Sequence, residues 1–441
     1  MKTLVWISVA LAVSVVMGCN LGANYTVGGT LTGLTGQGLV LQDNSGNDLG
    51  LASNGAFVFS DRIKNGDAYS VTIKTQPSTP SQTCTVQNGS GTIVKADVTN
   101  VIVSCAQVGR FAYVANQLSN NLSAYAINSS TGALSPVNGS PFAATGTNPA
   151  ALAVDPNGSF LYVANNGSNN VSVYSIDNTA GALTPVGIPI ATGSGPVAVT
   201  IDPTGSYLYV ANLASNSVSA YAIDGGSGTL TGLSNSPFAV GGEPTSLKAS
   251  PDGNYLYVTN FGDGSVTVLL IDSATGSLNG IAGSPFGAGN GALSIAIDPT
   301  GRYAYVANET AATISLYSIN ASTGALTAIS GSPLSTLTSP ESLAVDPAGR
   351  YVYAANVTAA NHVATYSITP SSGALILSGT PVAAGTFPIS MVLDPSGQFA
   401  YLVNDHSNNV SVYTVSATTG VLTPVNSAVA AGNAPRAIVV D

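Results

Sequence analysis

Side chains that could do chemistry are scarce in this chain. Charged residues make up only 7% of its 441 residues, and its only glutamates are Glu243, Glu309 and Glu341. Together with Arg436, they lie in segments that we expect to face one end of the fold. Glu309 and Arg436 could transfer a proton and hold a developing negative oxygen, which are two requirements of hydrolytic chemistry. These two residues are therefore the candidate catalytic residues.

The two histidines and a neighbouring acid are candidates for ligand binding. His362, His406 and Asp405 fall in predicted loops, and with Glu243 and Glu341 they form the predicted binding set. The histidines belong to adjacent repeats at different offsets, so a paired site is not indicated, and solvent-exposed loop side chains are the alternative. The sequence contains no Walker loop, nucleophile elbow or dense Cys/His cluster. We expect neither a metal site nor a cofactor.

A short phrase recurs seven times and predicts the elements that position these residues. It reads aromatic or apolar residue, Tyr, two apolar or small residues, then Asn. Its Asn falls at positions 116, 165, 212, 260, 308, 356 and 404, a period of 47 to 49 residues. Such a period, made of short strand patterns, predicts an all-β fold, a seven-bladed β-propeller over residues 108–441. We expect each recurring Asn to hydrogen-bond the backbone of the following turn rather than a ligand.

The repeat of residues 149–186 shows the expected blade. We predict its strands at residues 151–154, 160–164, 171–176 and 182–186, with a turn at Asp155-Pro156-Asn157-Gly158. The repeat region starts at Arg110-Phe111, which matches the start of a second strand, and ends at residues 437–441, which match an inner strand. One blade should therefore take its inner strand from the C-terminus, which closes the ring without a free edge.

Two segments carry a resemblance to known families. The runs DPTGRYAYVANETAATISLYSI and DPNGSFLYVANNGSNNVSVYSI resemble the seven-bladed lactonase family, which includes 6-phosphogluconolactonases and carboxymuconate-cyclising enzymes, and the YVTN-repeat surface proteins. The resemblance covers residues 108–441 and implies a site of His, Arg and Glu around the inner strands. Glu309 matches that family's Glu, and Arg436 matches an Arg. The residues aligned with its histidines, at 244–247 and 292–294, contain no His.

The N-terminal residues have the composition of an export signal. Val16-Met17-Gly18-Cys19 follows an apolar stretch and resembles a bacterial lipobox. The resemblance implies a signal peptide over residues 1–18, a lipidated Cys19 and a short linker over residues 19–24. Asn20 favours anchoring in the outer membrane of the bacterial cell envelope. An ordinary secretory signal with an incidental Cys is the alternative.

Residues 25–106 show a different pattern, with short alternating segments between Gly, Asn, Asp and Ser clusters. The pattern predicts a small antiparallel β-sandwich, and the segment resembles an immunoglobulin-like module of exported bacterial proteins. Cys84 and Cys105 lie in this exported domain, so we expect them to form a disulfide. The acidic run at residues 43–48 lacks the Glu of a calcium loop, so it is predicted to be a hairpin turn.

Charge excludes one class of function. The net charge is −10, and residues 108–441 hold 5 basic and 15 acidic residues, whereas nucleic-acid binding needs a basic stripe. We expect an envelope-anchored binding or scaffold module that contacts the membrane through its lipid. Its loop-rich propeller face would bind an unidentified protein, glycan or small molecule. A diverged lactonase-type hydrolase acting in the propeller funnel is the alternative.

Overall fold

The computed structural model describes residues 24–34, 36–77, 82–107, 111–336, 338–357, 361–425 and 427–441. The chain divides into two compact units, residues 1–107 and 108–441, which are described separately. The expected signal peptide and Cys19 lie outside the described residues. Every regular element in the described ranges is a strand, and these ranges contain no helix long and apolar enough to cross a membrane.

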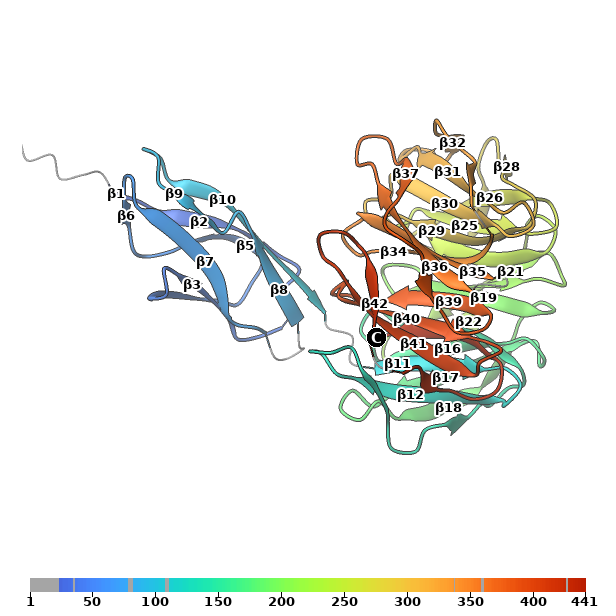
Figure 1. Cartoon of the computed structure of the whole chain (residues 1–441). Helices are drawn as coiled ribbons and strands as arrows, with labels where there is room; N and C mark the ends of the chain where they lie inside the picture. The colour runs from blue at the N-terminus through green and yellow to red at the C-terminus, as the bar shows by residue number, and fades with distance from the viewer. Residues whose placement is uncertain are drawn as a thin grey trace, which may run out of the picture. The chain divides into compact units, whose positions relative to one another are not determined.

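The first unit is a sandwich of two four-stranded sheets, with strand orders β5-β2-β10-β8 and β4-β3-β7-β9 (Figure 1). Its strands are β1 (Asn24–Tyr25), β2 (Val27–Thr32), β3 (Leu39–Asp43), β4 (Asn47–Leu51), β5 (Gly55–Val58), β6 (Ile63–Lys64), β7 (Ala68–Thr75), β8 (Gln82–Gln87), β9 (Ser90–Thr92) and β10 (Val98–Gln107). Leu41, Phe57 and Val103 lie in the core between the sheets. The prediction of a purely antiparallel sandwich was wrong, because β10 pairs with β2 in parallel.

The sandwich contains a disulfide between Cys84 and Cys105, which face each other on the antiparallel strands β8 and β10. The bond closes a loop with a sequence separation of 21 residues, and such a loop restricts the unfolded chain by about 3 kcal/mol. Asn44 and Ser45 have φ angles of 48° and 58° and join β3 to β4. The acidic run is therefore a tight hairpin turn, as predicted.

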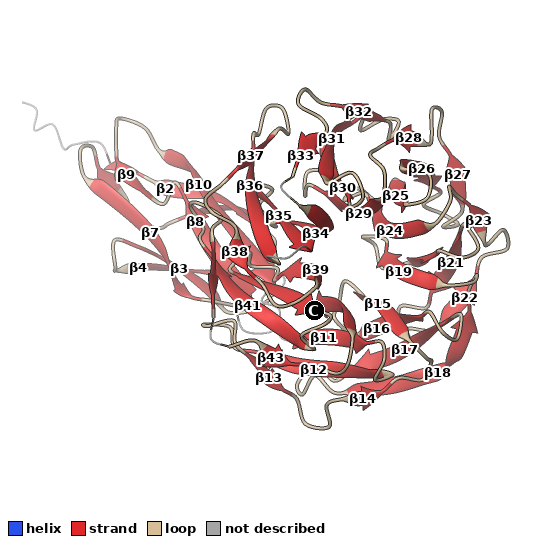
Figure 2. Cartoon of the chain, turned by 45° about the vertical axis from the view of Figure 1, so that its right-hand side comes forward, coloured by secondary structure: helices blue, strands red, loops and turns tan. Residues whose placement is uncertain are grey.

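The second unit is a seven-bladed propeller, whose inner strands lie nearest the axis in Figure 2. The inner strands are β15 (Pro149–Val154), β19 (Pro196–Ile201), β24 (Pro244–Ala249), β29 (Ala292–Ile297), β34 (Ser339–Val345), β39 (Pro388–Leu393) and β44 (Pro435–Val440). The second strands are β11 (Phe111–Asn116), β16 (Phe160–Asn165), β20 (Tyr207–Asn212), β25 (Tyr255–Asn260), β30 (Tyr303–Asn308), β35 (Tyr351–Val357) and β40 (Phe399–Asn404). Each blade is named below by its second strand.

Outside these lie the third and outer strands. The third strands are β12 (Asn121–Ile127), β17 (Asn170–Ile176), β21 (Ser217–Ile223), β26 (Ser265–Ile271), β31 (Thr313–Ile319), β36 (His362–Ile368) and β41 (Asn409–Val415). The outer strands are β13 (Leu134–Pro136), β18 (Leu183–Ala191), β22 (Leu230–Gly232), β27 (Leu278–Gly280), β32 (Leu326–Ala328), β37 (Leu375–Leu377) and β42 (Leu422–Pro424). Six blades add a short strand beside the third: β14 (Phe142–Ala143), β23 (Phe238–Ala239), β28 (Phe286–Gly287), β33 (Leu334–Ser335), β38 (Val382–Ala383) and β43 (Val429–Ala430).

The two ends of the propeller segment share one blade. The C-terminal strand β44 pairs antiparallel with β11, so that Val439 faces Tyr113. The backbone N–H of Phe111 also donates to the Asp441 carboxylate at 2.8 Å. The C-terminus accordingly lies beside β11 in Figure 1. This pairing supplies the inner strand of the β11 blade, so that β11 has a paired strand on both sides.

The recurring Tyr joins each blade to the next. In all seven blades its hydroxyl donates to the carbonyl of a Gly in the turn before the outer strand of the following blade, at 2.9 to 3.2 Å. Tyr162, for example, donates to the carbonyl of Gly228, which has a φ of +72°. A Cβ on Gly228 would lie 2.3 Å from the ring of Phe160, so a larger residue does not fit. The phrase therefore encodes blade-to-blade packing.

The recurring Asn is structural, but its partners differ from those expected. Asn116 is fully buried, and its amide donates to Asn121 at 2.8 Å and to Ser123 at 2.9 Å, both on the third strand. Its carbonyl oxygen accepts the N–H of Gly432 in the incoming loop. The predicted bond to the backbone of the following turn was therefore wrong, because the amide donates instead to polar side chains five and seven residues later in the chain.

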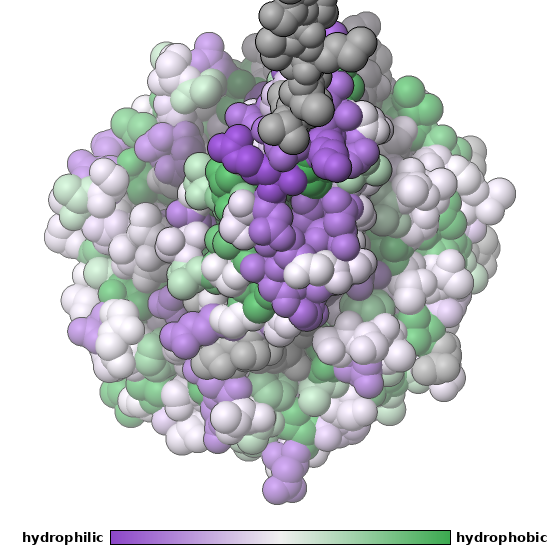
Figure 3. All heavy atoms as spheres, turned by 90° about the vertical axis from the view of Figure 1, so that its left-hand side faces the viewer, coloured by the Kyte–Doolittle hydropathy of each residue, from purple (hydrophilic) through white to green (hydrophobic). Residues whose placement is uncertain are grey.

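The surface of the propeller is poor in charge. The part in view in Figure 3 is mostly pale, the colour of side chains of intermediate hydropathy, with scattered hydrophilic and hydrophobic spots. This agrees with the charged fraction of 7% in the sequence. The few ionisable side chains of the propeller are therefore informative about where its function lies.

Candidate functional site

All seven inner strands begin with the same irregularity. In the β16 blade, Pro149 pairs with Asn165 and Ala151 with Ala164, so Ala150 is an additional, unpaired residue, a β-bulge. The same register shift occurs in the other six blades. The bulge residues form a set that we call the bulge ring: Ala150, Val197, Thr245, Leu293, Glu341, Ile389 and Arg436. All seven are at least partly exposed, because a bulge turns its side chain out of the ladder.

A second ring lies at the same end of the blades. In each blade the second-strand Asn pairs with the first or second residue of the inner strand, as Asn308 does with Ala292. The residue after that Asn therefore follows at this end of the blade. These residues form the shoulder ring: Gln117, Asn166, Leu213, Phe261, Glu309, Val357 and Asp405. We call the end of the propeller that carries both rings the bulge face.

Charged residues occupy only one side of the two rings. Glu309, Glu341, Asp405 and Arg436 come from the consecutive blades β30, β35, β40 and β11. The remaining blades, β16, β20 and β25, contribute no charged residue to either ring. The two rings therefore have one charged arc and one uncharged arc, and Glu243 and Asp263 lie beside the rings in the β25 blade.

Three members of the charged arc interact electrostatically. The pKa of Glu341 is raised to about 7: burial is the largest cause, the negative charge of Glu309 adds to it, and the positive charge of Arg436 opposes both effects. A half-buried carboxyl is costly to ionise, and a second carboxylate nearby adds to that cost. The structure thus brings the two predicted catalytic residues to a third, Glu341, which the sequence had placed only among the binding residues. Glu341 can exchange a proton near neutral pH.

Asp405 and His406 form a second cluster on this arc. The Asp405 side chain is almost fully buried, and one of its oxygens lies 3.4 Å from Nε2 of the more exposed His406. The His406 ring stacks on Phe387 with centroids 4.5 Å apart. The N–H of Asp405 donates to the Phe387 carbonyl at 2.9 Å, which fixes the loop. Phe387 therefore packs against the imidazole of His406.

The other two predicted binding residues, Glu243 and His362, belong to other blades. Glu243 precedes β24 with a φ of 54°, and its N–H donates to the Asn216 side chain of the preceding blade at 2.8 Å. His362 begins the third strand β36 opposite Asn356 and is half-buried. Within the described ranges, no three His, Cys, Asp or Glu side chains gather so that they could hold a metal ion.

A comparison with known protein families assigns the repeat region to one family. The family model described as lactonase, seven-bladed β-propeller, matches residues 68–249 and 243–439. The chain belongs to this lactonase family. A search of curated protein sequences gives no significant match.

Solved structures support the same propeller fold. A candidate 6-phosphogluconolactonase from Bacteroides uniformis is 21% identical, covers 76% of this chain and 100% of its own, and superposes with a TM-score of 0.67. The periplasmic gluconolactonase PpgL of Pseudomonas aeruginosa is 21% identical over 75% of this chain and 98% of its own, with a TM-score of 0.64. Hydrazine synthase of Kuenenia stuttgartiensis is 23% identical over 69% and 92%, with a TM-score of 0.53. At these identities the likeness concerns the fold alone.

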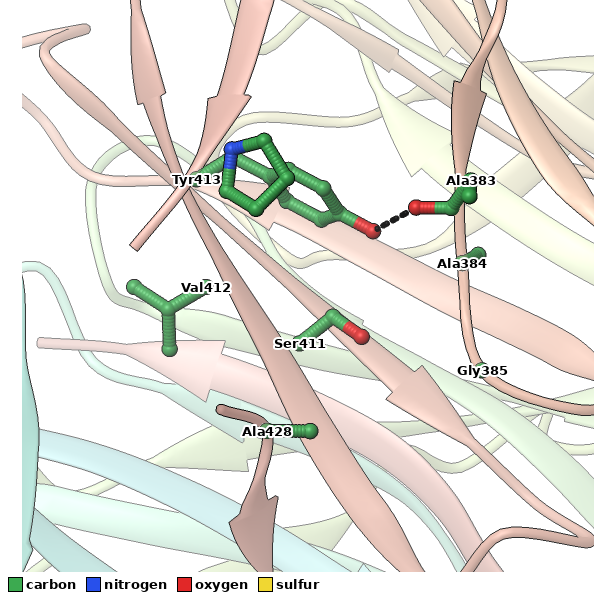
Figure 4. A pocket seen from close by; sticks show the side chains of 8 residues that line it. Ala383, Ala384, Gly385, Ser411, Val412, Tyr413 and Ala428 are labelled. Atoms are coloured by element: carbon green, nitrogen blue, oxygen red, sulfur yellow. Dashed lines mark hydrogen bonds between the residues drawn. The ribbon is translucent and has the colours of Figure 1, made fainter. Parts of the chain in front are cut away.

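This lactonase-family propeller also has a peripheral cavity. It has a volume of about 270 Å³ and is lined by Ala383, Ala384, Gly385, Ser411, Val412, Tyr413, Pro424 and Ala428 (Figure 4). The Tyr413 hydroxyl donates to the Ala383 carbonyl across it at 3.0 Å. The same type of bond recurs between other blades, as from Tyr125 to Ala430 and from Tyr317 to Gly287. This cavity is therefore part of the repeated blade contact, and it has no charged lining residue.

The sequence analysis did not identify Lys248 as a candidate site residue. Lys248 lies on the inner strand β24, three residues after the bulge residue Thr245. Desolvation by the surrounding chain lowers the pKa of Lys248, although its side chain is exposed. The available signal was compositional, since Lys248 is the only lysine of residues 108–441.

Proposed function

We propose that this lactonase-family protein hydrolyses small lactones at the charged arc of its bulge face. The observation that carries the proposal is the electrostatic coupling of Glu341 to Glu309 and Arg436, which come from three different blades. The solved structures with the same fold include proteins described as gluconolactonases, and sugar-type lactones are therefore the first substrates to test. Family membership supports the reaction class, while the residues of the arc support its location.

The proposed chemistry needs one proton carrier and one cation. Ionised Glu341 accepts a proton from a water molecule as the water attacks the lactone carbonyl carbon. Arg436 stabilises the negative charge that develops on the carbonyl oxygen. The ring C–O bond then breaks, and Glu341 returns the proton to the ring oxygen. The product is a hydroxy acid, and both the enzyme and the proton balance are restored.

Glu309 has a supporting part in this proposal. Burial is the largest cause of the raised pKa of Glu341, and the negative charge of Glu309 adds to it, so that Glu341 can both accept and release a proton at physiological pH. Because Glu341 is half-buried, its interactions with Glu309 and Arg436 are stronger than they would be in open water.

The test is hydrolysis of D-glucono-δ-lactone above the buffer rate, measured for the wild-type protein and for Arg436→Ala. Arg302→Ala is the matched control, because Arg302 follows a turn at the opposite end of its inner strand and contacts Thr300 and Tyr303. We expect Arg436→Ala to lose most of the turnover and Arg302→Ala to keep it. Wild-type protein that is folded and no faster than buffer would refute the proposal.

An anchored binding module is the second candidate. It is supported by the lack of His at residues 244–247 and 292–294, where related enzymes carry it by resemblance. In this proposal the charged arc holds a ligand without converting it, and lipidated Cys19 ties the protein to the cell envelope. Binding of D-gluconate without lactone turnover would favour this candidate. Loss of fatty-acid labelling in Cys19→Ser cells would test the anchor, and unchanged labelling would refute it.

A further inference from the structure

Lys248 differs in charge from the residues at the equivalent positions of the other six inner strands. It is the fifth residue of β24 and pairs with the buried Tyr257 of the second strand. Six other residues take the same place opposite the recurring Tyr: Ala153, Thr200, Ala296, Ala344, Val392 and Val439. All of these are small or apolar, except for the hydroxyl of Thr200, so Lys248 is the only charge at these positions.

Lys248 is exposed although it belongs to an inner strand rather than to an outer loop. Its side chain is exposed, yet burial in the surrounding chain lowers the pKa of Lys248. A lysine on an outer loop has neither protein on most sides nor a desolvation cost. Inner strands enclose the axis in Figure 2, so both observations fit an ammonium that reaches into solvent on the axis.

The Lys248 ammonium makes no hydrogen bond or ion pair with any residue in the described part of the chain. Asp202 and Asp298, which follow the two neighbouring inner strands, are already engaged. Each accepts three backbone N–H bonds and one Thr hydroxyl. The Coulombic partners of Glu341 do not include Lys248.

We propose that Lys248 is an anion-binding site on the propeller axis that takes the carboxylate of a small organic acid. A partly desolvated cation without a partner is costly, and a bound anion relieves that cost. The Lys248 ammonium and the half-buried Thr200 hydroxyl, which belong to equivalent positions of adjacent inner strands, supply two donors for the two oxygens of a carboxylate. A phosphate generally requires more donors than these two. The site does not depend on hydrolysis, and the acid can be a ring-opened lactone or an unrelated free acid.

The experiment measures binding of D-gluconate, acetate and inorganic phosphate to the mature protein by calorimetry. We expect Lys248→Met to weaken carboxylate binding at least tenfold, Lys248→Arg to retain most of it, and Thr200→Val to weaken it less. Arg302→Ala, which lies outside both sites, should bind as the wild type does. Lactone hydrolysis is assayed on the same variants, so loss of hydrolysis and loss of this site are recorded separately. Binding of gluconate with acetate supports a free acid as occupant, and binding of gluconate alone supports the ring-opened lactone.

A side-chain NMR titration provides a readout that does not depend on the stability of a variant. The Lys248 ammonium resonance of the wild-type protein, assigned by its absence in Lys248→Arg, should shift as gluconate is added. An unshifted resonance, or equal binding by folded Lys248→Met, would overturn the site. Phosphate bound more tightly than either carboxylate would overturn the choice of ligand.

Discussion

The β16, β20 and β25 blades and the β30, β35, β40 and β11 blades share one framework but differ at the bulge face. In both groups the buried Tyr binds the Gly of the next blade and the bulge occurs at the same register. Only the second group has charged residues in the bulge and shoulder rings. The repeated positions therefore build the ring, whereas the unpaired bulge positions are free to vary and can hold catalytic or binding residues.

The bulge explains why this variation is tolerated. A residue inside the ladder must pack between two blades, and its size is fixed by close packing. The bulge residue is left out of the ladder and is at least partly exposed, so Ala150, Leu293 and Glu341 can take equivalent places. Glu341 and Arg436 therefore cost the framework little, and the comparison can be tested by changing the two classes of residue separately.

The largest effect should come from removing the closing strand. Deletion of residues 436–441 removes most of β44 and leaves β11 without its inner partner. We expect loss of several kcal/mol, a large share of the stability of an ordinary domain, and a clearly lower melting temperature by circular dichroism. An unchanged melting temperature would contradict the role of β44 as a framework element.

A charged-arc variant should change activity and leave the framework intact. Arg436→Ala should lower lactone turnover by about 10²-fold, the effect of removing one group that stabilises an oxyanion. Its melting temperature should stay near that of the wild type, because Arg436 is an exposed bulge residue. A parallel loss of turnover and stability would break the distinction between the two classes of position.

A framework variant should show the reverse behaviour. Tyr257→Phe removes the hydroxyl that binds the Gly324 carbonyl at 3.0 Å in a buried contact. We expect a loss of about 1 to 3 kcal/mol in chemical unfolding, since a buried carbonyl loses its partner, with turnover per folded molecule unchanged. Equal stability of Tyr257→Phe and the wild type would show that the repeated bond adds little.

The smallest effect concerns the pH dependence of stability. The pKa of Glu341 is raised from 4.5 to about 7 on folding, so the folded state retains a proton that the unfolded chain releases. Stability contributed by this group is complete below pH 4.5 and falls as pH rises to about 7. Such a shift corresponds to about 3 kcal/mol, which we reduce to about 1 kcal/mol because water screens a half-exposed group.

Unfolding of the wild type and Glu341→Gln at pH 4 and pH 8 measures this term. The variant should gain stability relative to the wild type as the pH rises, because Gln does not ionise. A pH-independent difference between the two proteins would place Glu341 in a more solvated environment than the one described.

The repeat made much of the propeller predictable from sequence. The Tyr and Asn spacing gave the blade period, and the Pro-Gly turns gave the strand order, because both are local patterns. The bulge was not predicted, since it depends on how Pro149 and Ala151 pair across strands. The coupling of Glu309 to Glu341 was also missed, because it arises between adjacent blades. The parallel pairing of β2 with β10 in the sandwich is likewise a long-range contact.

Some errors had a signal that local reasoning overlooked. Asn116 is followed five and seven residues later by Asn121 and Ser123, and polar residues recur at these offsets in most other repeats. Those positions now appear as the amide's partners. The β35 blade departs from the rule with His362 and Ala364, and there Asn356 donates to the Ala354 carbonyl instead.

The most direct test of the account compares wild-type protein with Glu341→Gln in D-glucono-δ-lactone hydrolysis between pH 5 and pH 8, with melting temperatures taken on the same samples. The account predicts a wild-type rate above buffer that rises with pH through about 7, and a variant slower by about 10²-fold or more that is at least as stable. Equal rates for the two folded proteins, or no rate above buffer for the wild type, would contradict it.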